Sequence, residues 1–161
     1  MAKSKFSNIV AGHSYYYLSI PYYGDWKNAK IIGPAKCAKL SDFQNMVAAE
    51  ENDVVAKEEL EKLKEDIRSL ADMSYKNSYK AKIDACENCS TAEKQELWWV
   101  FAEYVCHVHK IGIRAGKVAY KDMYEGNCFE TKEQAEKFFD DLVHLFAKYG
   151  IIITRINNQF A

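Results

Sequence analysis

The N-terminal part of the sequence has the spacing of β-strands. Residues 14–20 alternate between two faces, which predicts a strand with one buried face. The buried face is expected to carry Tyr16, Leu18 and Ile20, and the other face Tyr15, Tyr17 and Ser19. Pro21 ends this strand, and residues 28–33 are expected to form a short second strand that stops at Gly33-Pro34.

From residue 41 onward the spacing becomes helical. Ser41 and Gln44 form a capping box, which predicts a helix start, and Asn52-Asp53 is a place where this helix can break and restart. After residue 55 the apolar positions are spaced 4-3-4-3, at Ala56, Leu60, Leu63, Ile67 and Leu70. A narrow stripe of this kind predicts an amphipathic helix with a seam like that of a coiled coil.

A second capping box, Ser90 with Glu93, predicts the longest helix of the chain. Its apolar positions are again spaced 4-3-4-3, at Leu97, Phe101, Tyr104, Val108 and Ile111. Further apolar residues surround most of the helix, and a helix of this kind is buried. We therefore expect a long central helix, which ends near Gly112 or continues to Gly126. The polar residues 76–90 before it are expected to form a loop or a short helix.

The C-terminal part predicts one more helix and one more strand. Thr131 and Gln134 form a third capping box, residues 135–149 carry a broad apolar face, and Gly150 stands where a helix-ending glycine belongs. Residues 151–156 have β-branched side chains on both faces, which favours a strand inside a sheet. Its expected partner is the strand at residues 15–20.

These elements predict one α+β domain over residues 1–161. It is expected to be predominantly helical, with three to four helices of which one is long and central. A small antiparallel sheet would join the N-terminal Tyr-rich strands to the C-terminal strand. The composition, 48% apolar, is enough to build a sizeable core. No stretch has the length of a signal peptide's apolar region or of a membrane span, so we expect a soluble, cytoplasmic protein.

The clearest candidate for a metal site is C-x2-C-x16-C-x2-H, formed by Cys86, Cys89, Cys106 and His109. If residues 91–110 are helical, however, Cys106 lies roughly 22 Å along the axis from the helix start, at about 1.5 Å per residue. Two thiolates on one zinc lie within roughly 4–5 Å of each other. We therefore expect no metal, and the five cysteines to be mostly reduced thiols. Whether Cys86 and Cys89 bind metal or form a disulfide stays open.

Other catalytic patterns are weak. Glu103 and His107 have the spacing of a surface pair on a helix, and His144 has the position of a surface histidine. Cys37 and Cys128 have no His or acid at a telling spacing, so neither is a convincing nucleophile. Because the sequence has no glycine-rich phosphate loop, it predicts no nucleotide cofactor.

The remaining candidate is the aromatic segment near the N-terminus. Residues 1–40 hold six Lys and one acid, a local charge of +5 in a chain whose net charge is −1. Aromatic rings beside Lys can stack on bases and neutralise phosphates, while an extended nucleic acid would need a longer basic face. The residues expected to bind are His13, Tyr15, Tyr17, Tyr22, Tyr23, Trp26, Lys27, Lys30 and Arg155.

Three functions fit this surface and these helices. The first is a non-catalytic binding protein, of the adaptor or inhibitor type, that contacts a protein partner or a nucleotide-like ligand. The second is a small enzyme that acts on a phosphate-bearing small molecule near His13 and Arg155. The third is a structural homo-oligomer, such as a homodimer, assembled through the helix seam at Leu63 and Ile67. The absence of a catalytic motif favours the first.

Overall fold

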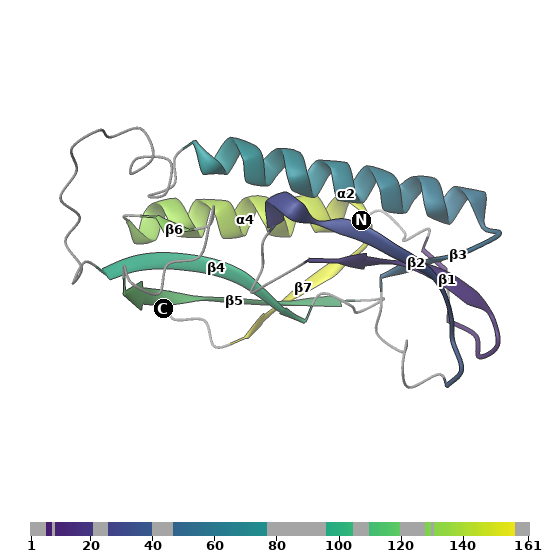
Figure 1. Ribbon diagram of the computed structural model, residues 1–161. Coiled ribbons are helices and arrows are strands. Elements are labelled where there is room, and N and C mark those ends of the chain that lie inside the picture. The colour runs from purple at the N-terminus through teal and green to yellow at the C-terminus, as the bar shows by residue number, and fades with distance from the viewer. Residues whose placement is uncertain are drawn as a thin grey trace.

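Over the residues that the computed structural model describes, two α-helices lie above two β-sheets (Figure 1). The structure describes residues 6–7, 9–20, 26–39, 47–76, 96–104, 110–119, 128–129 and 131–156; for 96–104, 110–119, 128 and 152–156 it describes the path of the backbone. Within these residues both helices lie on the same side of the sheets. The arrangement is therefore a helix layer on a sheet layer.

The first sheet is antiparallel and has the strand order β2-β1-β3. Strand β1 is Ser14–Ser19, as predicted; a short 3₁₀ helix, η1 (Trp26–Asn28), precedes β2 (Lys30–Lys36). The prediction that the second strand stops at Gly33-Pro34 is wrong. The register shifts by a bulge there, and Gly33 has a φ of 126°. A Cβ on Gly33 would lie 2.6 Å from the Tyr15 carbonyl oxygen, so glycine lets the strand continue.

Strand β3 (Ala48–Glu50) lies where a helix from Ser41 was predicted. Residues 41–46 are outside the described part of the chain. The helix instead begins after Asp53, whose carboxylate accepts a hydrogen bond of 3.0 Å from the Ala56 N–H, and α2 spans Val54–Tyr75. Four of the five predicted seam residues are confirmed, because Ala56, Leu60, Leu63 and Ile67 are buried. The fifth, Leu70, is only partly buried, and Ala71 beside it is buried instead.

The predicted central helix is wrong, because its residues form two antiparallel strands, β4 (Glu96–Tyr104) and β5 (Lys110–Ala119). A run that is apolar on every side fits a buried helix, but it equally fits a strand covered on both faces. Aromatic and β-branched residues favour the strand, and Gly112 and Gly116 disfavour a helix interior. The choice between an end near Gly112 and an end at Gly126 therefore no longer arises.

The last elements are β6 (Cys128–Phe129), α4 (Lys132–Lys148) and β7 (Ile152–Ile156), and the second sheet has the order β6-β4-β5-β7. The third capping box is confirmed at Thr131, and Gly150 has a φ of 76°, as expected of a glycine that ends a helix. The predicted partner of the last strand is wrong: β7 runs parallel to β5 and does not pair with β1. The chain crosses over through α4 between them, which brings a strand back parallel.

The predominantly helical fold class is therefore wrong. In place of three to four helices and one small sheet, the described residues contain two α-helices, a three-stranded antiparallel sheet and a four-stranded mixed sheet. The α+β character remains, but the long central element is a β-hairpin. Each of the two helices has one apolar stripe at helical spacing, and this spacing does not fit the two-residue alternation of a strand.

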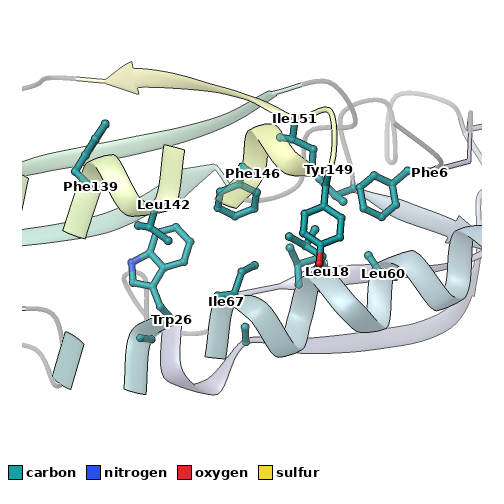
Figure 2. Packing of buried hydrophobic residues seen from close by; sticks show 14 of the residues in the cluster. Phe6, Leu18, Trp26, Leu60, Ile67, Phe139, Leu142, Phe146, Tyr149 and Ile151 are labelled. Carbon is teal, nitrogen blue, oxygen red and sulfur yellow. The ribbon is translucent and has the colours of Figure 1, made fainter. Parts of the chain in front are cut away.

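One apolar core lies between the helix layer and the sheets. It includes Leu18 of β1, Ile67 of α2, Phe129 of β6 and Phe146 of α4. Trp26 is fully buried in this core, beside Leu142 and Phe146 (Figure 2), and its ring centroid lies 6.3 Å from that of Phe146 in an edge-on arrangement. A smaller cluster on the other side of the first sheet buries Tyr15, Cys37 and Ala48.

Replacing Trp26 by Ala should therefore destabilise the fold by about 3–5 kcal/mol, because it leaves a cavity next to Phe146. Urea unfolding followed by circular dichroism measures this loss. Lys30→Ala, at an exposed position, is the control and should change stability by less than about 0.5 kcal/mol. A Trp26→Ala protein as stable as the control would contradict the burial of this side chain.

The cap of α4 allows a finer test. The Gln134 N–H donates to Thr131 Oγ1 at 3.2 Å, and the Thr131 N–H donates to Gln134 Oε1 at 3.3 Å. Thr131→Ala removes the first bond and should cost about 1 kcal/mol, whereas Thr131→Ser keeps the hydroxyl and should change the stability by no more than a few tenths of a kcal/mol in either direction. The difference between the two unfolding midpoints is the measurement, and equal midpoints would show that the cap contributes nothing.

Candidate functional site

The aromatic strand contributes more to the core than to the surface. Tyr15 is fully buried, its hydroxyl oxygen accepts a hydrogen bond of 2.7 Å from the Val10 N–H, and burial raises its pKa. Trp26 is also fully buried. Tyr16, predicted to be a core residue, is partly buried, and the Lys57 ammonium lies 4.4 Å from the centre of its ring. The prediction that Tyr15 and Trp26 are free to bind a ligand is therefore wrong.

The other residues predicted at this surface are not brought together as one site. His13 is exposed, and its Nδ1 lies 2.5 Å from Glu50 Oε1 on the neighbouring strand. Tyr17 is partly buried against the smaller cluster. Lys27 lies near α2, 3.9 Å from Asp72, while Lys30 is exposed at the start of β2.

Three residues predicted at this surface remain, namely Tyr22, Tyr23 and Arg155. Tyr22 and Tyr23 lie outside the described residues. Arg155 belongs to β7, which pairs with β5 in the second sheet. The strand pairing that was expected to bring Arg155 beside Tyr15 and Tyr17 is therefore not formed.

The candidate metal ligands Cys86, Cys89, Cys106 and His109 also lie outside the described residues. The argument against a zinc site assumed a helix at 91–110, and that premise is wrong because β4 occupies most of this range. Glu103 is in β4 too, so it cannot pair with His107 in the predicted helical way. Over the described part of the chain, no three His, Cys, Asp or Glu side chains are grouped as a metal site would require.

A cleft that the sequence did not predict lies where α2, α4 and β6 meet. Its volume is about 330 Å³. Phe129 and Phe138 are almost fully buried beneath it, with ring centroids 5.7 Å apart. The residues that line it are Leu70, Met73, Ser74, Phe129, Gln134, Lys137, Phe138 and Asp141. The cleft thus combines apolar walls with a polar rim, which is the usual make-up of a binding site.

Met73 gives this cleft its exposed apolar surface. Its side chain is large and apolar, and yet 66% of its surface is exposed. Methionine has three rotatable bonds and a polarisable sulfur, so it adapts its shape to a bound apolar group. On the opposite wall, Lys137 Nζ lies 2.9 Å from Asp141 Oδ2, and this exposed ion pair limits the cleft on the α4 side.

A second, more open hollow of about 520 Å³ lies further along the same two helices. At this hollow Asp66 links α2 to the end of α4. Lys148 Nζ lies 3.1 Å from Asp66 Oδ2, and the Tyr149 hydroxyl donates a hydrogen bond to the same oxygen. The acids around it, including Glu59, Glu61 and Glu65, form a solvated face. These contacts hold the helices together and make no site by themselves.

No protein-family model, curated protein or solved structure matches this chain. Neither described helix contains a stretch long and apolar enough to cross a bilayer.

The sequence held partial signals for this cleft. Leu70 was part of the predicted seam, and Phe138 was part of the predicted apolar face of the last helix. Met73 lies outside the seam on the helical repeat, so it is an apolar residue without a core position. To place these three residues at one cleft, one must know that α2 packs beside α4. The predicted central helix, which is wrong, obscured that packing.

The contact between Tyr149 and Asp66 predicts a pH dependence. Burial, followed by the hydrogen bond to Asp66, raises the pKa of Tyr149 well above its ordinary value of 10.0. The stabilising contribution is complete below pH 10 and is lost as the pH rises towards the folded-state pKa. Between pH 8 and pH 11 the unfolding midpoint should therefore fall more steeply in the unmodified protein than in Tyr149→Phe. Equal slopes would contradict the raised pKa.

Proposed function

We propose that this chain is a non-catalytic binding protein whose cleft between α2, α4 and β6 receives an apolar side chain of a protein partner. The observation that carries the proposal is the exposure of Met73 above the buried pair Phe129 and Phe138. At this cleft Met73 is grouped with Leu70, Phe129 and Phe138, and apolar residues grouped at a hollow often mark interaction sites.

The size of the cleft favours a side chain over a large cofactor. Ligand pockets range over about 300–1,000 Å³, and this cleft lies at the small end of that range. Protein interfaces are commonly dominated by a few apolar anchors that fill such hollows. The adaptable side chains of Leu70 and Met73 form the wall that such an anchor would touch.

The rim supports the same class of ligand. Ser74 on α2 and Gln134 on α4 supply polar groups on both sides of the apolar wall, and the Lys137–Asp141 pair adds both signs of charge. A peptide needs this mixture, because its backbone amides and carbonyls must be hydrogen-bonded around the buried anchor. A strongly anionic ligand would instead favour a rim of one charge sign, which is not what the residues at this cleft provide.

The test selects peptides directly against the cleft. A phage-displayed peptide library is panned on the unmodified protein after depletion on Met73→Glu, and the Kd of each enriched peptide is measured by fluorescence anisotropy. We expect enriched peptides to share a large apolar residue and to lose about tenfold or more in affinity for Met73→Glu.

Two matched variants sharpen this result. Met73→Leu keeps an apolar wall, so its affinity should stay within about threefold. Lys62→Glu changes the charge of an exposed residue elsewhere on α2 and should leave the affinity unchanged. The proposal is wrong if no peptide survives the depletion, or if the enriched peptides bind Met73→Glu as tightly as the unmodified protein.

A further inference from the structure

Gln134, on the α4 wall of the cleft, has one end of its side-chain amide held in place by the capping box. The Thr131 N–H donates to Gln134 Oε1 at 3.3 Å, while the Gln134 N–H donates to Thr131 Oγ1 at 3.2 Å. A backbone N–H can only donate, so the amide atom that it meets must be the oxygen. The capping box therefore leaves the NH2 end of this amide, Nε2, for another partner.

Gln134 Nε2 carries two N–H donors. Within the described residues these donors have no partner, because the bond from Thr131 is the one hydrogen bond of the Gln134 side chain. Gln134 is exposed at the rim of the cleft, so its donors face solvent in the free protein. A partner that fills the cleft displaces that solvent, and it has to supply an acceptor in exchange.

The opposite wall of the cleft carries a second polar group. Helices α2 and α4 run antiparallel (Figure 1), so the last turn of α2 and the first turns of α4 line the same cleft. Ser74 of α2 is half-buried there, and its hydroxyl has no hydrogen-bond partner within the described part of the chain. A hydroxyl can donate or accept. Polar groups thus stand on both walls, with the buried rings of Phe129 and Phe138 beneath them.

We propose that the partner binds this cleft as an extended segment, with Gln134 Nε2 donating to a backbone carbonyl next to the apolar anchor. This inference rests on the proposed function and names the form of the partner. In an extended chain, the backbone groups of successive residues point to opposite sides, and the side chains stand perpendicular to them. With the anchor in the cleft, one carbonyl can face Gln134 on α4, and a group of the next residue can face Ser74 on α2.

A helical partner fits these polar groups less well. Inside a helix the backbone N–H and C=O groups are paired with each other, except in the first and last turns. A helix could fill the apolar floor of the cleft, but its backbone would cover Gln134 Nε2 without giving it an acceptor. Because a donor left without a partner costs affinity, Gln134 selects for an extended segment.

The test removes the donor and keeps the cap. In Gln134→Glu a carboxylate oxygen still accepts from the Thr131 N–H, as glutamate does in capping boxes, so α4 should begin as before. The NH2 group becomes an oxygen, which repels a carbonyl. The peptides used are those that the panning enriches and that bind Met73→Glu weakly. Their Kd, measured by fluorescence anisotropy, should rise about threefold to tenfold for Gln134→Glu.

Lys132→Gln is the control for charge. It changes the net charge by the same amount as Gln134→Glu and lies in the same turn of α4, but Lys132 is not one of the residues that line the cleft. Its contact with Glu136, 3.7 Å long, is an ion pair near the surface and contributes little. The affinity of this variant should stay within about twofold of that of the unmodified protein.

A second measurement identifies the acceptor on the peptide. The carbonyl on each side of the anchor is made part of an ester in turn, because an ester carbonyl accepts hydrogen bonds more weakly than an amide carbonyl. One of the two esters should lose about threefold or more in affinity for the unmodified protein. It should lose much less for Gln134→Glu, since that variant already lacks the donor.

The outcomes separate this inference from the proposed function. Peptides that bind Met73→Glu weakly, but bind Gln134→Glu as tightly as the unmodified protein, keep the cleft as the binding site and overturn the extended segment. Peptides that lose affinity for Gln134→Glu, while neither ester matters, place a side-chain acceptor at Gln134 and overturn it too. If panning enriches no peptide that distinguishes Met73→Glu, the proposed function is wrong and this inference fails with it.

Circular dichroism melts show whether Gln134→Glu keeps the fold. If it does not, the esters decide the question on the unmodified protein alone. In that case a loss for one ester supports the inference, and no loss for either ester overturns it.

Discussion

The packing of both halves of the chain into one apolar core is the interaction on which the remaining structure depends. Trp26 comes before β2, whereas its edge-on partner Phe146 lies in α4, more than a hundred positions later. This contact and its neighbours must offset the conformational entropy lost when two distant segments are held together. The cleft exists because the same packing sets α4 beside α2, with Met73 left at the boundary.

The elements that could be predicted from the sequence are those with a single apolar stripe and clear ends. Helix α2 buries four of the five residues of its predicted seam, and α4 has a capping box and is followed by a glycine that adopts a positive φ. The hairpin of β4 and β5 could not be predicted in this way. Residues such as Trp98 and Trp99 are apolar in succession, so helical spacing and strand alternation both fit them. Only pairing across the sheet separates the two, and pairing is not visible in a local pattern.

The aromatic segment shows the same limit for function. Its density of Tyr and Trp predicts a binding surface, and the structure gives a different reason for part of that density. Strand β1 is covered on both sides, by the main core at Leu18 and by the smaller cluster at Tyr15. A large aromatic residue with a polar end can be buried when that end finds a partner, as Tyr15 does at Val10. Composition shows that a segment is rich in aromatic residues, but it does not show whether other parts of the chain bury them.

The parallel pairing of β5 with β7 has a consequence for synthesis of the chain. A ribosome completes the first sheet and α2 early, because their strands are close in sequence. The second sheet has to wait, since β7 follows α4 and pairs with Lys110–Arg114, about forty residues before it. Until then that edge of β5 lacks the described neighbour that will occupy it, and an open strand edge is a place where nascent chains join wrongly. Chaperones that hold emerging strands would therefore matter most between the release of β5 and the release of β7.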